Sequence, residues 1–456
     1  MRKAPYLARL FGLALTAALL CALPGCGSAS GGRRAEGAGA GVGGTGASRV
    51  GVALSAEQGL EPLLSSLVAQ CPLPSGYAIA GRRGAGEKLS LAWHRTGALG
   101  DATPPGSVAL GRRWLAPAAD LLDPRCSVSA SDAASMGLRD LSGIGLPERA
   151  LEVEGLWPGQ KGYSLEEELL LGYEGGDGEI KAWAARAGAE LKSGRIRLAG
   201  VSGERPLILA AVGDIVPGEA EAHFLSEGEP GLRALFGKSL PELRKADILV
   251  GNLEGVVSER GEGNPRKRFQ FRFPLSMPKA IESAGFDLVL LGNNHVFDFG
   301  EEAFADSLEN LAGAGLPEVG AGRNGKEALA CRAAANGAMS GPDTGLVFIG
   351  FGSFPAERYG FTTAEAAAGE GKAGINADEA ATDEAIAEAS RGGKRVIVLA
   401  HGGNEYRAEP SSAVKARYRR FIDSGAAAVL GSNPHILQGI EAYRGGLIAY
   451  SLGNFL

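Results

Sequence analysis

Three of the five histidines in this 456-residue chain stand directly behind short apolar runs, beside asparagine, aspartate or glutamate. Histidines kept only for structure would be scattered through cores and surfaces, so this placement favours a functional site. Five apolar runs end in such polar segments: 213–214, 251–254, 292–295, 401–405 and 431–435. The histidines concerned are His295, His401 and His435, whereas His94 and His223 lie elsewhere.

The donor groups in these segments are carboxylates, amides and imidazoles, supplied by Asp214, Glu254, Asn294, His401 and His435. A mixed oxygen and nitrogen set suits Mn²⁺, Fe or Zn²⁺ better than a metal that prefers thiolates. Two cations about 3.5–4 Å apart, bridged by a carboxylate, clamp the attacking and leaving oxygens in phosphoryl transfer. The residue types therefore predict one or two divalent metal sites.

The elements that must position these groups follow from Pro206 onward, where apolar runs alternate with amphipathic segments, as in layered α/β folds. Ser276 is a predicted helix start and Gly285 a predicted stop. Because sites in such folds form beyond the carboxyl ends of strands, the polar segments are expected to converge on one rim. The predicted strands are 207–212, 247–250, 287–291, 346–351, 395–400 and 426–430, and the predicted helices are 240–245, 278–284, 301–312, 379–390 and 413–424.

Six short motifs occur in a fixed order in this half: GDIVPG at 213–218, NLE at 252–254, NNHVFDFG at 293–300, HGGNEY at 401–406, PHILQ at 434–438 and YSLGNF at 450–455. In order and wording they resemble the CapA family of poly-γ-glutamate capsule synthesis proteins. That family belongs to the calcineurin-like metallophosphatase superfamily. The resemblance covers 206–456 and says nothing about the preceding half.

The resemblance implies metal-ligand roles for Asp214, Asn294, His401 and His435. Glu254 takes the place of the carboxylate that bridges two metals.

His295 takes the place of the acid that protonates a leaving group or steadies a phosphate. Asp298 and Glu405 are expected either to assist this chemistry or to cap turns. Asn252 and Asn433 are expected to help bind the substrate.

Two departures from the superfamily pattern bear on the metal count. Val216 stands where the first motif usually has a histidine, and Asn433-Pro434-His435 replaces a segment that usually holds two histidines. One ligand is thus missing and another is softened to an amide. A two-metal centre, a one-metal centre and a phosphate-binding relic are all left open, and so is catalytic turnover.

A basic run of Arg266, Lys267, Arg268 and Arg272 precedes the helix predicted at 278–284. It is either a solvated loop or a contact for an anionic polymer or phosphorylated substrate, with Arg268 and Arg272 as the candidate binding residues. The net charge of −6 gives no support to nucleic-acid binding, which calls for a basic surplus.

The first 26 residues are typical of a bacterial lipoprotein signal peptide. Arg2, Lys3 and Arg9 precede an apolar stretch, and Leu23-Pro24-Gly25-Cys26 resembles a lipobox in which Cys26 is acylated. A Gly-, Ala- and Ser-rich tether follows at 27–48. We therefore expect an exported protein, anchored by lipid to the extracytoplasmic face of the membrane, with capsule-synthesis membrane proteins among its partners.

The segment 49–203 reads as a smaller α/β domain of unknown role. Its predicted elements are strands at 50–55, 77–80, 89–93 and 107–110 and a helix at 58–70. Trp93, Trp114 and Trp157 are expected to pack in its core or to line a cleft. Cys71 and Cys126 share this segment and could pair in the oxidising compartment reached after export, but sequence does not show that they meet.

The predicted architecture is therefore a metallophosphatase-like layered α/β sandwich at 204–456, preceded by the smaller α/β domain. Three functions remain: a metal-dependent phosphoesterase in polymer assembly, a polyanion-binding assembly factor without catalysis, and a solute-binding lipoprotein acting through 49–203.

Overall fold

The computed structural model describes residues 207–456 except 220, 266, 335–344 and 356–359. Before residue 207 it describes shorter stretches, of which the longest are 50–56, 60–75, 87–95, 107–120, 166–174 and 178–192. The chain divides into two compact units. The N-terminal unit is Cys21–Leu207, and the C-terminal unit is Ile208–Leu456 together with Met1–Leu20.

The N-terminal unit is built on a mixed sheet in the order β3-β2-β4-β10-β5-β7, with β8 also paired to β5. Its elements are β2 (Val50–Ala56), α1 (Glu61–Gln70), β3 (Tyr77–Ile79), β4 (Glu87–Arg95), β5 (Ser107–Asp120), β6 (Ser127–Val128), β7 (Leu138–Asp140), β8 (Glu148–Ala150), β9 (Glu152–Val153), β10 (Glu166–Glu174) and α3 (Gly178–Lys192). Helices α1 and α3 pack on this sheet through Leu64, Leu67 and Trp183.

A buried tryptophan that the sequence analysis did not single out anchors this core. The indole Nε1 of Trp183 donates to the carbonyl oxygen of Cys71 over 3.0 Å. The side chains of Trp93, Trp114 and Trp157 lie outside the described residues. Cys71 is buried with a free thiol, and Cys126 is likewise outside the described residues.

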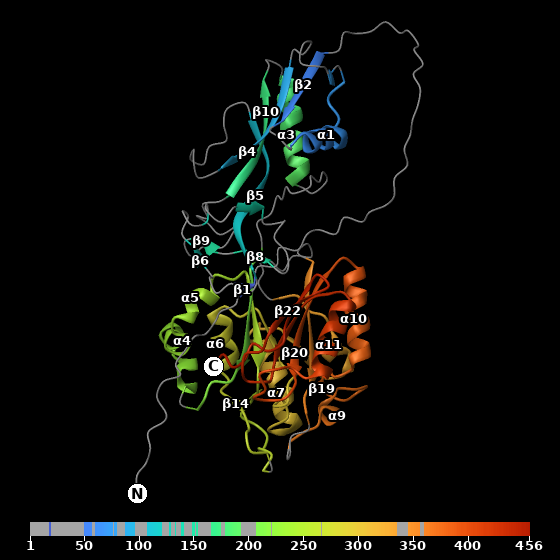
Figure 1. The fold of residues 1–456 in the computed structure, drawn as a ribbon. Helices are drawn as coiled ribbons and strands as arrows, with labels where there is room; N and C mark the ends of the chain where they lie inside the picture. Colours follow the sequence, from blue (N-terminus) through green and yellow to red (C-terminus); the bar gives the residue numbers. More distant parts are fainter. Residues whose placement is uncertain are drawn as a thin grey trace. The chain divides into compact units, whose positions relative to one another are not determined.

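Two parallel sheets form the centre of the C-terminal unit (Figure 1). The first has the order β1-β11-β12-β15-β16, and the second has the order β18-β20-β21-β23-β22. The strands of the first are β1 (Ala18–Leu19), β11 (Leu209–Ile215), β12 (Ile248–Leu253), β15 (Leu288–Leu290) and β16 (Glu318–Val319). Those of the second are β18 (Leu346–Ser353), β20 (Arg395–Gly402), β21 (Ala426–Ser432), β22 (Ile440–Tyr443) and β23 (Gly446–Ala449).

Only the edge pairs β1–β11 and β22–β23 are antiparallel in these two sheets. All six residues of β12 are buried, as expected for a central parallel strand covered on both faces.

Helices cover the outer faces, which gives an α/β/β/α sandwich and confirms the predicted fold class. Residues of α4, α5, α6 and α7 share a core with the first sheet, and residues of α10 and α11 share one with the second. The bounds are η3 (Ala222–Ser226), α4 (Gly228–Phe236), α5 (Ser239–Leu243), α6 (Met277–Ala284), α7 (Gly300–Gly313), α8 (Gly325–Leu329), α9 (Thr363–Ala366), α10 (Glu379–Arg391) and α11 (Ser412–Asp423). Two small ribbons complete the unit: β13 (Val256–Val257) with β14 (Arg272–Phe273), and β17 (Ala321–Gly322) with β19 (Gly374–Ile375).

Local signals account for the helix ends. The side chains of Asp378 and Ser411 accept hydrogen bonds from the first turns of α10 and α11. Helix α6 ends at Gly285, whose φ of 111° is left-handed, as the sequence predicts. Ser276 stands at the predicted helix start, but its side chain makes no capping bond, and Pro278 in the first turn sets the start instead.

The strands run further than their apolar residues indicate. Strand β11 continues through Asp214, β12 through Asn252 and β20 through His401. The predicted strands stop short of these polar residues because hydrophobicity ends there, whereas ladder hydrogen bonds with neighbouring strands continue. Asp214, Asn252 and His401 are therefore held on regular strand ends.

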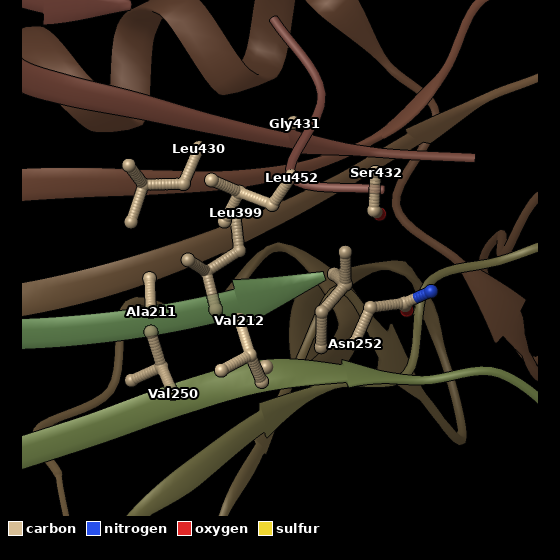
Figure 2. A pocket seen from close by; sticks show the side chains of 11 residues that line it. Ala211, Val212, Val250, Asn252, Leu399, Leu430, Gly431, Ser432 and Leu452 are labelled. Carbon is tan, nitrogen blue, oxygen red and sulfur yellow. The ribbon is translucent and has the colours of Figure 1, made fainter. Parts of the chain in front are cut away.

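A small cavity lies between the inner faces of the two sheets, next to these strand ends (Figure 2). Its walls are mainly apolar, with Val212 and Val250 from the first sheet and Leu399 from the second. Asn252 and Ser432 supply its polar groups.

One close backbone contact joins the end of β11 to the segment after β23. The Asp214 amide donates to the Gly453 carbonyl over 2.9 Å, and the Phe455 amide donates to the Asp214 carbonyl over 2.8 Å. A Cβ atom on Gly213 would lie 1.8 Å from the Gly453 oxygen, so only glycine fits there.

Replacing this glycine tests the contact. We expect Gly213→Ala to destabilise the C-terminal unit by about 2–3 kcal/mol, because the added methyl group must push two backbones apart. Thermal unfolding should show a fall in Tm on the order of 5–10 °C. Gly313→Ala is the matched control, since Gly313 ends α7 with no atom within 4 Å of an added Cβ, and its Tm should stay level or rise. Equal Tm values for the two variants would contradict the close approach.

Candidate metal centre

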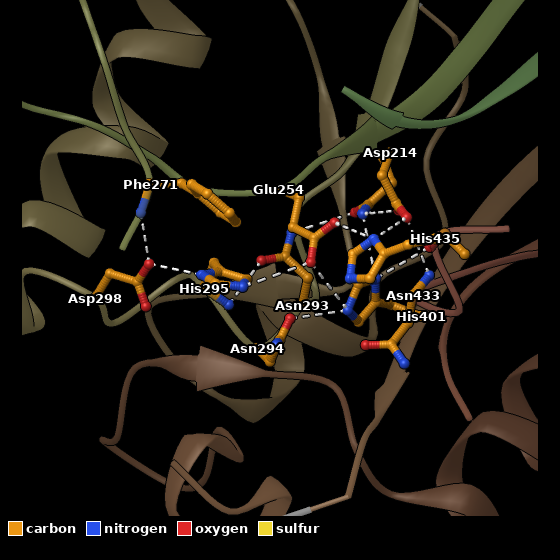
Figure 3. Close-up of polar contacts among 12 residues, drawn as sticks. Asp214, Glu254, Phe271, Asn293, Asn294, His295, Asp298, His401, Asn433 and His435 are labelled. Carbon is orange, nitrogen blue, oxygen red and sulfur yellow. Dashed lines mark hydrogen bonds and ion pairs between the residues drawn. The ribbon is translucent and has the colours of Figure 1, made fainter. Parts of the chain in front are cut away.

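Side chains from both sheets meet beyond the carboxyl ends of their strands (Figure 3). Asp214 lies in β11, Glu254 directly follows β12, and Asn294 follows β15. His401 lies in β20, and His435 follows β21. The structure thus brings together all five residues that the sequence predicts as ligands. The first four are at most 3% exposed, and His435 is half-buried.

One group of donors consists of Asp214, Glu254 and His435, which could hold a metal ion because their ligand atoms all lie within 4.8 Å of one another. The Nδ1 atom of His435 lies 3.1 Å from Asp214 Oδ2 and 4.0 Å from Glu254 Oε2. The Asn252 side-chain amide donates to the other Asp214 oxygen over 2.8 Å. Asp214 Oδ2 is therefore the oxygen that faces the group.

A second group consists of Asn294, His401 and the same glutamate. The Nε2 atom of His401 lies 2.9 Å from Asn294 Oδ1 and 3.8 Å from Glu254 Oε1. The other ring nitrogen, Nδ1, is occupied by Asn252 Nδ2 and Ser432 Oγ, each at 3.1 Å. Nε2 is thus the nitrogen that could bind a metal ion.

Glu254 stands between the two groups, with Oε1 toward His401 and Oε2 toward His435. Both oxygens are buried and have no hydrogen-bond partner among the described residues. Burial first, and then the charge of Asp214, raise the pKa of Glu254 well above its usual value. A carboxylate held in this way is costly unless a cation compensates it, so the donor set fits a divalent metal.

Burial and neighbouring groups also shift the pKa values of three other residues in the cluster. Burial lowers the pKa of His401 to about 3, so its imidazole is neutral at physiological pH, as a ligand must be. Burial opposes ionisation of Asp214, but hydrogen bonds from His435 and Asn252 and the nearby imidazoles outweigh it and lower its pKa. Burial likewise opposes protonation of His435, but the hydrogen bond and charge of Asp214 outweigh it and raise its pKa.

Backbone strain concentrates at this rim. Asn433, His435 and Tyr406 have positive φ values of 92°, 59° and 54°. The Tyr406 amide donates to the Pro434 carbonyl over 2.9 Å, and the two rings of Tyr406 and His435 are 5.6 Å apart. Residues other than glycine keep such conformations only where the surroundings enforce them, which is common at functional sites.

A buried ionic chain supports the edge of the cluster next to His295. Asp298 Oδ2 lies 2.7 Å from His295 Nδ1, so this nitrogen carries the proton and Nε2 faces Glu254 at 3.7 Å. The Lys267 ammonium lies 2.6 Å from Asp298 Oδ1 and donates to the Asn294 carbonyl over 2.9 Å. The Phe271 amide donates to Asp298 Oδ2 over 2.8 Å. Asp298 and Lys267 therefore position His295.

Lys267 is a site residue that the sequence does not distinguish from its neighbours in a basic run. Of that run, Arg268 is exposed and stacks 5.0 Å above the ring of Phe269. Arg272 donates to the carbonyls of Arg260 and Gly261 over 2.8 and 2.7 Å, so it pins a loop. Arg266 lies outside the described residues.

The remaining predicted site residues lie around the cluster. Asn252 is buried and bonded to Asp214, and the Asn433 side chain donates to the Gly403 carbonyl over 2.8 Å. Glu405 is exposed, near enough for its charge to raise the pKa of Glu254 and His435. Cys26 lies outside the described residues.

Removing the charge of Glu254 tests the electrostatic account. We expect Glu254→Gln to stabilise the metal-free protein at pH 7.5 by about 1–2 kcal/mol, a rise in Tm of several degrees, while weakening metal binding. The raised pKa means that the folded state holds this proton more tightly, so wild-type stability falls as pH rises from the ordinary value of 4.5 toward the folded value. The gain in Tm should therefore vanish near pH 4, as calorimetry in EDTA would show.

Glu441→Gln is the matched control, because Glu441 is half-buried but paired with Arg419 at 2.6 Å, which lowers its pKa. Its loss should lower Tm at pH 7.5. A Glu254→Gln variant that is also less stable at pH 7.5 would contradict the unpaired carboxylate.

The buried ion pair has a separate test. We expect Lys267→Met to cost about 3–5 kcal/mol, because it leaves the Asp298 carboxylate buried without its cation. Adding Asp298→Asn should restore a large part of that loss. Lys279→Met, which breaks an exposed pair with Glu282, should cost no more than about 1 kcal/mol in denaturant melts. Additive losses in the double variant would show that the pair is not coupled.

Comparison with known proteins places the sandwich and its cluster in a family. The sequence model of the family described as bacterial capsule synthesis protein PGA_cap matches residues 208–456. This range is the C-terminal unit without Met1–Leu20, and it contains every residue of the cluster.

Individual relatives match over about half of this chain. The capsule biosynthesis protein CapA of Bacillus anthracis is 28% identical over 261 residues, which is 55% of this chain and 59% of that protein. The PGA biosynthesis protein CapA of Bacillus subtilis is 28% identical over 249 residues, which is 54% of this chain and 62% of the relative. A probable polyglutamine synthesis accessory protein of Mycobacterium tuberculosis is 30% identical over 235 residues, or 48% and 58%.

The chain thus spans about three fifths of the length of the curated relatives it matches. The family match rests on more than half of the chain, in agreement with the order of motifs and the convergence of their side chains. The chain belongs to the bacterial capsule synthesis (PGA_cap) family, the CapA family.

Proposed function

We propose that this protein serves biosynthesis of a capsule or poly-γ-glutamate polymer at the cell envelope through a metal-dependent, phosphoesterase-like site. The observation that carries the proposal is the unpaired Glu254 carboxylate between two groups of neutral or anionic donors. The names of the relatives, which refer to capsule and poly-γ-glutamate biosynthesis, support the biological role.

The donor set supports a divalent cation of the Mn²⁺, Fe or Zn²⁺ type, since imidazole and carboxylate oxygens suit these ions. The two faces of Glu254 offer places for two cations, with Asp214 and His435 at one and Asn294 and His401 at the other. When bound, such cations supply charge stabilisation to the oxygens of a phosphoryl group.

The chain's own groups complete the chemistry. His295 presents Nε2 to the cluster while Asp298 holds the Nδ1 proton, so a protonated ring can donate its Nε2 proton to a leaving oxygen. Lys267 keeps Asp298 in place for this task. In hydrolysis a water molecule attacks phosphorus and loses a proton to solvent as the bond to the leaving oxygen breaks, and the proton from His295 neutralises that oxygen.

The substrate is proposed to be a phosphorylated compound or an anionic polymer. Arg268 is exposed on the loop that also carries Lys267, where a polyanion can reach it. Asn433 lies at the strained rim, next to the exposed segment of Glu405 and Tyr406. These residues are candidate contacts for the substrate.

The proposed location is the extracytoplasmic face of the membrane, with attachment through acylated Cys26 and with capsule-synthesis membrane proteins as partners. The signal-peptide pattern supports this location. Within the described parts of the chain, every helix is too short or too polar to span a bilayer.

Metal analysis and a phosphoesterase assay test the proposal together. We expect the purified full chain to bind Mn²⁺ and to hydrolyse p-nitrophenyl phosphate or its bis ester. Asp214→Ala and His401→Ala should each lower both metal content and turnover by about 100-fold or more. His223→Ala removes an exposed histidine elsewhere and should change neither.

Turnover that survives Asp214→Ala would refute the hydrolase. Bound metal without turnover of any phosphoester would instead favour an assembly factor that binds polyanion, and retention of labelled poly-γ-glutamate by the protein would then identify it.

A further inference from the structure

We propose that Asn454 is a metal ligand, and that its amide oxygen supplies the donor which Val216 in the first motif lacks. This inference rests on the proposed metal site and adds one residue to it. The juxtaposition that carries it is a short contact between Asn454 and His435, on the side of the cluster occupied by Asp214.

The contact places Asn454 Oδ1 2.9 Å from His435 Nδ1. That nitrogen also lies 3.1 Å from Asp214 Oδ2 and 4.0 Å from Glu254 Oε2. Three oxygen atoms therefore surround one imidazole nitrogen. In the metal-free protein a proton on Nδ1 satisfies Asp214 and Asn454, and a cation in its place would meet three oxygens and one nitrogen.

Asn454 is held there by the backbone on both sides. The Gly453 carbonyl accepts from the Asp214 amide, and the Phe455 amide donates to the Asp214 carbonyl. Asp214 and Asn454 are thereby paired as parallel strand neighbours. Neighbours in register point their side chains to the same face, so the Asn454 side chain lies on the face of the sheet that carries the Asp214 carboxylate.

The surrounding packing leaves the segment little freedom. Gly453 has a φ of 67°, and its amide donates to Ser451 Oγ over 3.2 Å. The Phe455 ring stacks on Phe236 with centroids 5.9 Å apart. The Asn454 side chain itself is exposed, so a cation can reach its oxygen, while the backbone that carries it is restrained, which favours affinity.

The Asn454 oxygen also replaces a metal-binding side chain that the first motif lacks. Val216 takes the position of the usual histidine, and it packs against the apolar core of the first sheet. The Asn454 oxygen completes a four-donor set with Asp214, Glu254 and His435, in which oxygen outnumbers nitrogen. Such a set shifts preference toward oxygen-loving cations such as Mn²⁺ rather than Zn²⁺.

The test measures Mn²⁺ affinity of the full chain by calorimetric titration after removal of metal with EDTA. Asn454→Leu keeps the side-chain shape without the oxygen, and we expect it to weaken binding about 10–100-fold. Asn454→Asp keeps an oxygen donor and adds charge, so its affinity should equal or exceed that of the wild type. Gln438→Leu removes another amide from the same rim, whose donor group bonds the Arg407 carbonyl, and should leave affinity unchanged.

Thermal melts in EDTA separate coordination from folding. The metal-free Tm of Asn454→Leu should stay near that of the wild type, while the rise in Tm on adding Mn²⁺ should shrink. Wild-type affinity in Asn454→Leu, with binding lost in Asp214→Ala, would overturn the role of Asn454 and leave the proposed function standing. Absence of Mn²⁺ binding by the wild type would overturn both. A loss of affinity in Asn454→Asp equal to that in Asn454→Leu would mark the residue as structural and refute the inference.

Discussion

The burial of one carboxylate without a partner is the constraint on which the C-terminal unit depends. Glu254 is fully enclosed, and among the described residues no donor reaches either of its oxygens. Such a carboxyl is costly to ionise, as its raised pKa indicates, so the rest of the unit must supply enough stability to tolerate it. Residues that make a site reactive toward a cation are commonly kept at the expense of stability.

The two-sheet architecture explains how that stability is supplied. Each sheet has its own helical cover and its own apolar core, so neither relies on the polar cluster for packing. The cluster lies where the carboxyl ends of β11, β12, β20 and β21 meet, above the small cavity between the sheets. Asn252 and Ser432 join cavity and cluster, since both contact the same nitrogen of His401.

Much of this arrangement can be predicted from the sequence. The apolar runs indicate the strands, and the glycine and polar residues at their ends indicate the site. The runs predict the six main strands, and their polar ends predict the five candidate ligands that the structure brings together. The N-terminal unit is harder to predict, since β5 extends to Asp120 although the first apolar run ends at Leu110 and is followed by a glycine and two arginines. Trp183 lies in a helix that the sequence analysis did not identify, and its partner is a backbone carbonyl without any sequence signature.

The residues that sequence reasoning missed share a physical cause. Lys267 belongs to a basic run, and only tertiary packing selects it for burial against Asp298. Asn454 lies in a recognised motif, but its contact with His435 depends on pairing between strands distant along the chain. A sequence shows which groups are present near a strand end, but not which of them a non-local backbone bond will bring into contact.

The distance along the chain between the residues of the cluster has a kinetic consequence. Asp214 is bonded to the amide of Asn433, 219 positions later, and the Gly453 backbone closes on Asp214 later still. Contacts of this kind close long loops, so the donors of the second sheet join those of the first only when the two sheets pack together. The full set of candidate donors is therefore assembled at a late step of folding, when the two sheets pack together, rather than in the folding nucleus.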